Sequence, residues 1–216
     1  MHSSARSLHA YLSHLMDTRR SCQRWRYDPL ALLRTFLDDP RNSPNDAFGR
    51  GPDPYNWQEL SYFEAWIWTH DVDGPTMALF LAHGADPLAG GEGQSVAFRI
   101  LKGSDDPEPI VMLLDAGLPL DCEWGHHGWT LFHQASSFHS QERSSRILPV
   151  LVDRAIQAGR QDLLQAVSRE RVEDLGQTPM DVALMGWHWA SIRLLAKHVP
   201  VTENVRRAAV AKGVTL

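Results

Sequence analysis

Three histidines lie close together in the stretch GHHGWTLFHQASSF, which covers residues 125–138. His126 and His127 are adjacent, and His133 follows in the same stretch. Neutral imidazole is a common metal ligand and a common general base, so this spacing raises the question of a metal or catalytic site. No cysteine or carboxylate completes a tetrahedral ligand set at the usual spacing, although Cys122 is near in sequence. We therefore predict neither a metal site nor a cofactor.

A second group of ionisable residues consists of Glu64, His70, Asp71 and Asp73. Carboxylates beside an imidazole suit acid–base chemistry, but the group lacks the spacing of a nucleophile and its base. The glycine-rich GGEG at 90–93 is not followed by the Lys-Ser/Thr pair of a phosphate-binding loop. The sequence therefore predicts a protein that is not an enzyme, and it leaves open an unfamiliar catalytic unit in residues 1–56.

The composition is that of a globular protein. Of 216 residues, 43% are hydrophobic and 22% are charged, and the net charge is −5. No long Lys/Arg block is present, which disfavours nucleic acid as a partner and favours a protein with a basic surface.

Targeting and redox signals are sparse. No stretch approaches the roughly eighteen apolar residues of a membrane span, and residues 1–20 do not resemble a Sec signal peptide. Cys22 and Cys122 form no disulfide framework and no CxxC pair. We expect a cytoplasmic protein that does not bind membranes.

The chain contains internal repeats. FLAHGAD, at 80–86, aligns with LLDAGLPLD, at 113–121, at an offset of 33 residues. GWTLFHQA, at 128–135, aligns with GQTPMDVA, at 176–183, at an offset of 48, so the later spacing contains an insertion. The insertion is visible at 137–145 and around 160–175.

These repeats resemble the ankyrin-repeat family. GWTLFHQA and GQTPMDVA are similar to its opening G-x-T-P-L-H-x-A, and AHGADP and DAGLPLD are similar to its GAD closing. Four degenerate copies cover 57–88, 91–121, 126–159 and 174–200. The resemblance implies an all-α solenoid of helix-turn-helix repeats with hairpin loops, which binds other proteins through its concave face.

Local signals agree with helices at these positions. Thr130 and Thr178 suit N-caps, and Pro179 suits a first helical turn. Gly84 and Gly117 follow apolar runs and suit left-handed helix ends.

The flanking segments extend the array at both ends. We expect residues 1–56 to form an N-terminal helical cap, with a capped helix starting at Asp28-Pro29 and a Pro/Gly-rich loop at 40–56. Residues 57–200 hold the repeats, and residues 201–216 form a C-terminal capping helix.

The resemblance also assigns roles to the opening stretch. His133 occupies the histidine position of the family motif, so we expect it to form structural hydrogen bonds. Aromatic residues at hairpin tips favour partner contact, because tryptophan, tyrosine and arginine dominate protein interfaces. The predicted partner-binding residues are Glu92, Trp124, His126, His127, Trp129, Gln134 and Phe138.

Three roles remain open. The first is an immunity or antitoxin protein that is a monomer alone and neutralises a bacterial toxin by tight one-to-one binding. The second is an effector that is delivered to a host cell and binds a host protein. The third is an enzyme whose catalytic unit lies in residues 1–56. We prefer the first because the chain is small, acidic and without a recognisable delivery signal.

Overall fold

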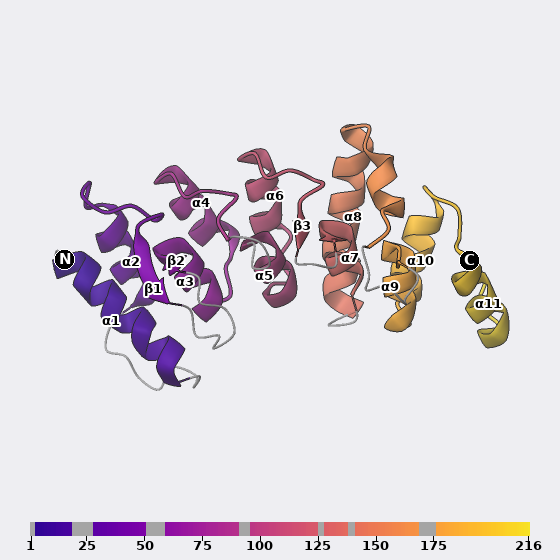
Figure 1. The fold of residues 1–216 in the computed structure, drawn as a ribbon, viewed down its shortest axis with the longest axis horizontal. Coiled ribbons are helices and arrows are strands. Elements are labelled where there is room, and N and C mark those ends of the chain that lie inside the picture. Colours follow the sequence, from indigo (N-terminus) through magenta and orange to yellow (C-terminus); the bar gives the residue numbers. More distant parts are fainter. Residues whose placement is uncertain are drawn as a thin grey trace.

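The computed structural model describes residues 3–18, 28–50, 59–90, 96–124, 128–137, 141–168 and 176–216. These residues are mostly α-helical, which confirms the prediction of an all-α protein. Figure 1 shows the helices side by side along one long axis, with the two ends of the chain at opposite ends of the stack.

The helices form two rows. The first row is α1 (Ser3–Thr18), α3 (Tyr62–Thr69), α5 (Val96–Gly103), α7 (Leu131–Ser136), α9 (Pro179–Met185) and α11 (Glu203–Lys212). The second row is α2 (Pro29–Leu37), α4 (Gly74–Ala82), α6 (Glu108–Asp115), α8 (Gln141–Gln157) and α10 (Trp189–Ala196). Each first-row helix contacts the next one in its row, and α2 contacts α4, α4 contacts α6 and α8 contacts α10. Successive helix pairs therefore stack on one another (Figure 1).

The segments that join successive pairs turn back on themselves. β1 (Ala47–Arg50) pairs with β2 (Glu59–Ser61), and β3 (Glu123–Trp124) pairs with β4 (Trp129–Thr130), both antiparallel. In the other two links, described residues pair through backbone hydrogen bonds, Val96 N–H to Ala89 O at 3.1 Å and Ser168 N–H to Gln177 O at 2.9 Å. The latter link includes a short 3-10 helix, Gln161–Gln165.

The strand β1 corrects the prediction that 40–56 is entirely loop. Prolines lie on both sides of 45–51 but not within it, so the backbone N–H groups there are free to pair. Phe48 is buried, which anchors the strand against the helices.

Polar side chains fix where the helices begin. The first-row helices α3, α7, α9 and α11 have Ser61, Thr130, Thr178 and Thr202 at their N-caps. In the second row, Asp28 and Asp73 cap α2 and α4 by accepting hydrogen bonds from backbone N–H groups. The predicted caps Thr130, Thr178 and Asp28 are confirmed, as are the first-turn positions of Pro29 and Pro179.

Three second-row helices end in the same left-handed turn. Gly84, Gly117 and Gly159 have φ values of 79°, 108° and 68° after α4, α6 and α8. In each turn the residue after the glycine donates its N–H to the carbonyl five residues earlier, for example Leu118 to Leu113 at 2.9 Å. The predicted ends at Gly84 and Gly117 are confirmed.

The insertion lengthens one helix. α8 is 17 residues long and begins at Gln141, inside the insertion predicted at 137–145. Pro149 lies within it. Even so, no helix of the described residues combines the length and apolar character that crossing a bilayer requires.

One hydrophobic core runs through the stack, from Ala5 in α1 to Val205 in α11. α7 is the most enclosed element, since every one of its residues is buried. Trp66 is 2% exposed and is part of this core. The first pair belongs to this core through Leu8 and Phe36.

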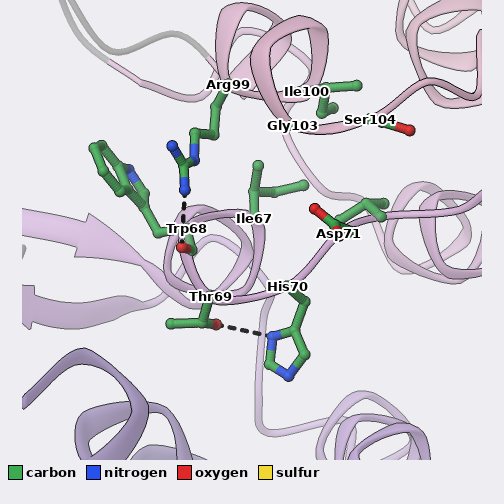
Figure 2. A pocket seen from close by; sticks show the side chains of 10 residues that line it. Ile67, Trp68, Thr69, His70, Asp71, Arg99, Ile100, Gly103 and Ser104 are labelled. Carbon is green, nitrogen blue, oxygen red and sulfur yellow. Dashed lines mark hydrogen bonds between the residues drawn. The ribbon is translucent and has the colours of Figure 1, made fainter. Parts of the chain in front are cut away.

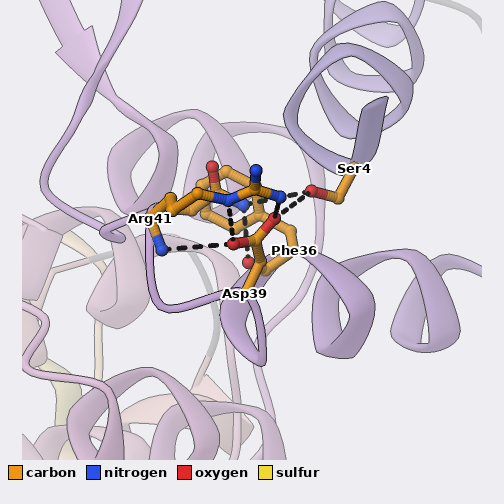
Figure 3. A network of polar contacts seen from close by, with 5 residues as sticks. Ser4, Phe36, Asp39 and Arg41 are labelled. Atoms are coloured by element: carbon orange, nitrogen blue, oxygen red, sulfur yellow. Dashed lines mark hydrogen bonds and ion pairs between the residues drawn. The ribbon is translucent and has the colours of Figure 1, made fainter. Parts of the chain in front are cut away.

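A polar network ties α1 to the turn after α2 (Figure 3). Asp39 accepts two hydrogen bonds from the Arg41 guanidinium, at 2.8 and 2.7 Å, and one from the Ser4 hydroxyl at 3.2 Å. Asn42 donates to Ser4 Oγ and to the Phe36 carbonyl. These bonds hold the pKa of Asp39 well below its usual range, chiefly through Arg41.

Two glycine-to-alanine substitutions test the helix-end geometry. Gly117 has φ 108°, a conformation that costs an L-residue about 1–2 kcal/mol, so G117A should lower the free energy of unfolding by about that amount. Urea denaturation followed by circular dichroism measures the change.

Gly103 is the matched control. It ends α5 without a left-handed φ and with room for a methyl group, so G103A should leave stability unchanged or raise it by up to about 1 kcal/mol. Equal effects of the two substitutions would show that the left-handed turn does not stabilise the stack.

Candidate functional site

Most of the predicted hairpin contacts lie outside the described residues: Glu92, His126, His127 and Phe138. The backbone of Trp124 is described and pairs with Trp129 in the hairpin. Trp129 is half-buried, and its ring centroid lies 6.2 Å from that of His133 in a stacked arrangement.

His133 forms structural hydrogen bonds, as predicted. It is fully buried, and its Nδ1 accepts from the Thr130 N–H at 3.1 Å. Its Nε2 lies 2.9 Å from the Gln177 carbonyl, so the proton resides on Nε2 and joins this helix pair to the next. Burial lowers the pKa of His133, while the carbonyl bonds oppose that shift. Both ring nitrogens are occupied, and His133 has no capacity left for a metal or substrate.

The structure buries Gln134, which was predicted to contact a partner. Its side chain is 6% exposed, because α7 lies between α5 and α9 and against α8. A side chain so enclosed offers a partner almost no surface.

The described surface is hollowed elsewhere, at the turns between first-row and second-row helices. A small cavity of about 150 Å³ lies between α3 and α5 (Figure 2). A larger cleft of about 480 Å³ adjoins it and reaches the start of α2. The two share His70, Asp71, Val72 and Ser104 in their linings, and we call them together the turn cleft.

Arg99 forms one wall of the turn cleft. Its guanidinium carbon lies 4.6 Å from the centre of the Trp68 ring, and its Nη2 donates to the Trp68 carbonyl at 3.3 Å (Figure 2). Burial lowers the pKa of Arg99, and the nearby Asp71 carboxylate opposes the shift. The stacked cation is therefore held in place against α3.

His70 is held by neighbours on both ring nitrogens. Its Nε2 lies 2.9 Å from the Tyr11 hydroxyl and its Nδ1 lies 2.8 Å from Thr69 Oγ1. Its ring stacks on Trp66 with 4.0 Å between centroids. Thr69 itself donates to the Ala65 carbonyl, so Nδ1–H donates to Thr69 and Nε2 accepts from Tyr11. Such an imidazole orients α1 against α3 and is not placed to accept a substrate's proton.

Five aspartates line the larger part of the turn cleft: Asp28, Asp71, Asp73, Asp105 and Asp106. Three have a local structural role, since Asp28 and Asp73 cap α2 and α4, and Asp106 accepts from the Glu108 N–H at the start of α6. The hydrogen bonds from Thr76 lower the pKa of Asp73. The three carboxylates face a region where three helices begin.

Asp71 and Asp105 are different, because neither caps a helix. Both are exposed, and Asp105 lies 3.6 Å from Arg146 of α8. Hydrogen bonds to helix-start N–H groups therefore explain three of the five cleft aspartates, whereas Asp71 and Asp105 accept none at a helix start.

Sequence reasoning considered Asp71 and Asp73 for acid–base chemistry, rejected it, and missed the cleft. A signal for it was present, since each of these second-row helices is preceded by an aspartate near a proline: Asp28-Pro29, Asp73-Gly-Pro75 and Asp106-Pro107. The repeat places the three aspartates on one edge of the stack.

The described part of the chain holds no group of three His, Cys, Asp or Glu side chains placed to bind a metal ion. Burial raises the pKa of the Cys122 thiol to about 12, so it stays protonated at neutral pH and is a poor nucleophile. Cys22 lies outside the described residues.

A scan against protein-family models finds no match to this chain, and a search of curated proteins finds none either.

Stability should fall as the pH drops below about 6.5. Burial lowers the folded-state pKa of His70, His133 and His188 below the unfolded value of 6.5. Below pH 6.5 these histidines bind protons in the unfolded chain but not in the folded chain. Lowering the pH therefore favours unfolding until the folded-state pKa is reached. Each histidine contributes up to about 1.4 kcal/mol per pH unit in that window.

Urea denaturation between about pH 7.5 and pH 5.5 measures this loss. A free energy of unfolding that stays constant across this pH range would contradict the assignment of these histidines as buried and neutral.

Proposed function

We propose that this chain is an ankyrin-type repeat protein that binds another protein and catalyses no reaction. Three features support the proposal: stacked helix pairs, hairpin links between the pairs, and left-handed turns after α4, α6 and α8. The bonds of His133 within its own turn and to the next link are those expected for the family motif. Arrays of this kind present long rigid surfaces, which suits recognition.

The observation that carries the choice of partner is the pair Asp71 and Asp105 in the turn cleft. They add exposed negative charge to a depression that already contains three aspartates bonded to N–H groups at helix starts. Leu30 is 38% exposed at the same cleft and offers an apolar contact. An acidic cleft with an apolar wall fits a basic segment of a partner, with lysine or arginine heads at the carboxylates and their stems on the leucine.

The hairpin tips form a second proposed contact surface. Trp124 and Trp129 pair in the hairpin that follows α6, Trp129 is partly exposed, and His126 and His127 stand between them in the sequence. In the ankyrin family the hairpins and first helices border the concave face. We keep these residues in the proposal and remove Gln134, which is buried.

The biological role that we propose is an immunity or antitoxin protein for a bacterial toxin with a basic surface. Many toxins that act on nucleic acids are basic, and an acidic neutralising partner associates rapidly with them through electrostatic steering. The net charge of −5 supports the same pairing.

Removing charge from the turn cleft should weaken partner binding. We expect D71N with D105N to raise the Kd at least tenfold, about 1.4 kcal/mol, and to reduce its salt dependence, because both carboxylates face the proposed basic segment. Isothermal titration calorimetry at two salt concentrations measures both effects.

The matched control is D153N with D115N. It removes the same amount of charge from α8 and α6. D115N breaks the exposed Asp115–Arg154 ion pair, just as D105N breaks the exposed Asp105–Arg146 ion pair. An equal loss of affinity in both double variants would show that net charge, and not the turn cleft, sets the affinity.

Co-expression tests the proposed biological role. The product of the neighbouring gene, expressed alone in bacteria, should arrest growth, and this protein should restore growth and co-elute with that product in a one-to-one complex. The D71N/D105N variant should restore growth less well than the D153N/D115N control. A harmless neighbour, or rescue without complex formation, would exclude the immunity role while leaving protein binding itself open to the titration above.

A further inference from the structure

A patch of aromatic and basic side chains lies where α9, α10 and α11 meet. The Trp187 and Trp189 ring centroids are 6.0 Å apart, and Lys212 Nζ lies 5.0 Å from the centre of the Trp187 ring. Arg193, one turn after Trp189 on α10, donates through Nε to the Thr215 carbonyl at 3.0 Å. We call Trp187, Trp189, Arg193 and Lys212 the tryptophan patch.

Trp187 has an unusual backbone. Its φ is +57°, and among the described residues no other non-glycine residue has a positive φ. Its N–H donates to Leu184 O at 2.9 Å, and the next N–H, of His188, donates to Ala183 O at 3.0 Å. This is the same turn that ends α4, α6 and α8.

Four helices of the described chain fill the left-handed position of this turn with glycine: Gly84, Gly117, Gly159 and Gly213. α9 fills it with tryptophan, although a side chain at positive φ is strained. The indole does not recover that cost by burial, because Trp187 is 50% exposed. A strained residue with an exposed aromatic side chain points to selection for function.

The charges around the patch point to the chemistry of its ligand. Residues 185–216 contain one acidic residue, Glu203, which lies on the far end of α11 from Lys212 and pairs with Arg207 at 3.8 Å. Arg193 and Lys212 are exposed, and among the described residues no carboxylate forms an ion pair with either. This end of the stack is basic, whereas the whole chain carries a net charge of −5.

We propose that the tryptophan patch binds an acidic segment of a protein partner that carries an apolar or aromatic side chain. The apolar side chain packs on the exposed face of Trp187, and neighbouring carboxylates bind the Lys212 ammonium and the Arg193 guanidinium. Lys212 already lies over the indole, so one ligand carboxylate reaches it while the segment covers the ring.

This surface is separate from the turn cleft, and its charge is opposite. The cleft is lined by residues of the first three helix pairs, and the patch belongs to α10, α11 and the turn before α10. The inference therefore goes beyond the proposed function. Binding at the tryptophan patch does not depend on binding at the turn cleft, so either proposal can fail without the other.

Peptide selection tests the inference. A display library of random 12-residue peptides is panned on the full chain and on two variants, W187G and K212E. We expect the wild type to enrich peptides rich in Asp and Glu around one apolar or aromatic residue. Calorimetry on the enriched peptides should give a Kd at least tenfold higher for each variant.

W187G separates binding from folding. Glycine is the usual residue at this turn, so the variant should melt at the same temperature as the wild type or higher while it loses the acidic peptides. K212E keeps the indole and changes only the charge. R34E is its matched control, because Arg34 is an exposed arginine on α2, far along the chain, and R34E should bind the peptides like the wild type.

Three results would overturn the inference: no enrichment of acidic peptides, acidic peptides that bind W187G as tightly as the wild type, or a single-stranded oligonucleotide that competes for the patch more strongly than those peptides do. A fourth is self-association of the wild type, measured by ultracentrifugation, that W187G abolishes, since the occupant would then be a second copy of this chain. Basic peptides that bind all variants equally would instead report on the turn cleft.

Discussion

The fold rests on one constraint: a pair of short helices cannot bury its own apolar side, so each pair must stack on its neighbours. α7 shows the result, because a helix of six residues is buried on every side by α5, α8 and α9. Such stacking requires each helix to start and stop at a defined residue. The hydroxyl and carboxylate N-caps and the left-handed turns supply that definition, and His133 joins one pair to the next through Gln177.

The same constraint places charge on the surface. A second-row helix that begins at the edge of the stack exposes backbone N–H groups, and an aspartate satisfies them. Stacking then brings the aspartates of α2, α4 and α6 to one edge, where they line the turn cleft. Capping alone would produce a mildly acidic edge. Asp71 and Asp105 add exposed negative charge without accepting hydrogen bonds at a helix start, and the proposal of a basic ligand rests on that difference.

The sequence predicted what is decided within a few residues. The caps at Thr130 and Thr178 and the ends at Gly84 and Gly117 follow from short-range backbone chemistry, and the structure confirms them. It did not predict features that depend on packing between helices far apart in the chain. Gln134 was assigned to a surface because its own segment does not reveal that α5 and α9 enclose it. The cleft was missed for the same reason, since its aspartates lie far apart in the chain.

The same left-handed turn ends several helices, so the residue at its left-handed position can be compared between them. At Trp187 this comparison separates what the fold requires from what it does not. If Trp187 served only the fold, glycine would serve it better, as it does at the equivalent positions after α4, α6 and α8. Core packing does not supply a reason either, because half of the side chain is exposed and its recorded ring partners are Trp189 and Lys212. Neither the turn nor the core therefore requires a tryptophan at this position. The acidic cleft is lined by residues of the first three helix pairs, the basic aromatic patch lies at α10 and α11, and a single continuous core joins these two parts of the stack.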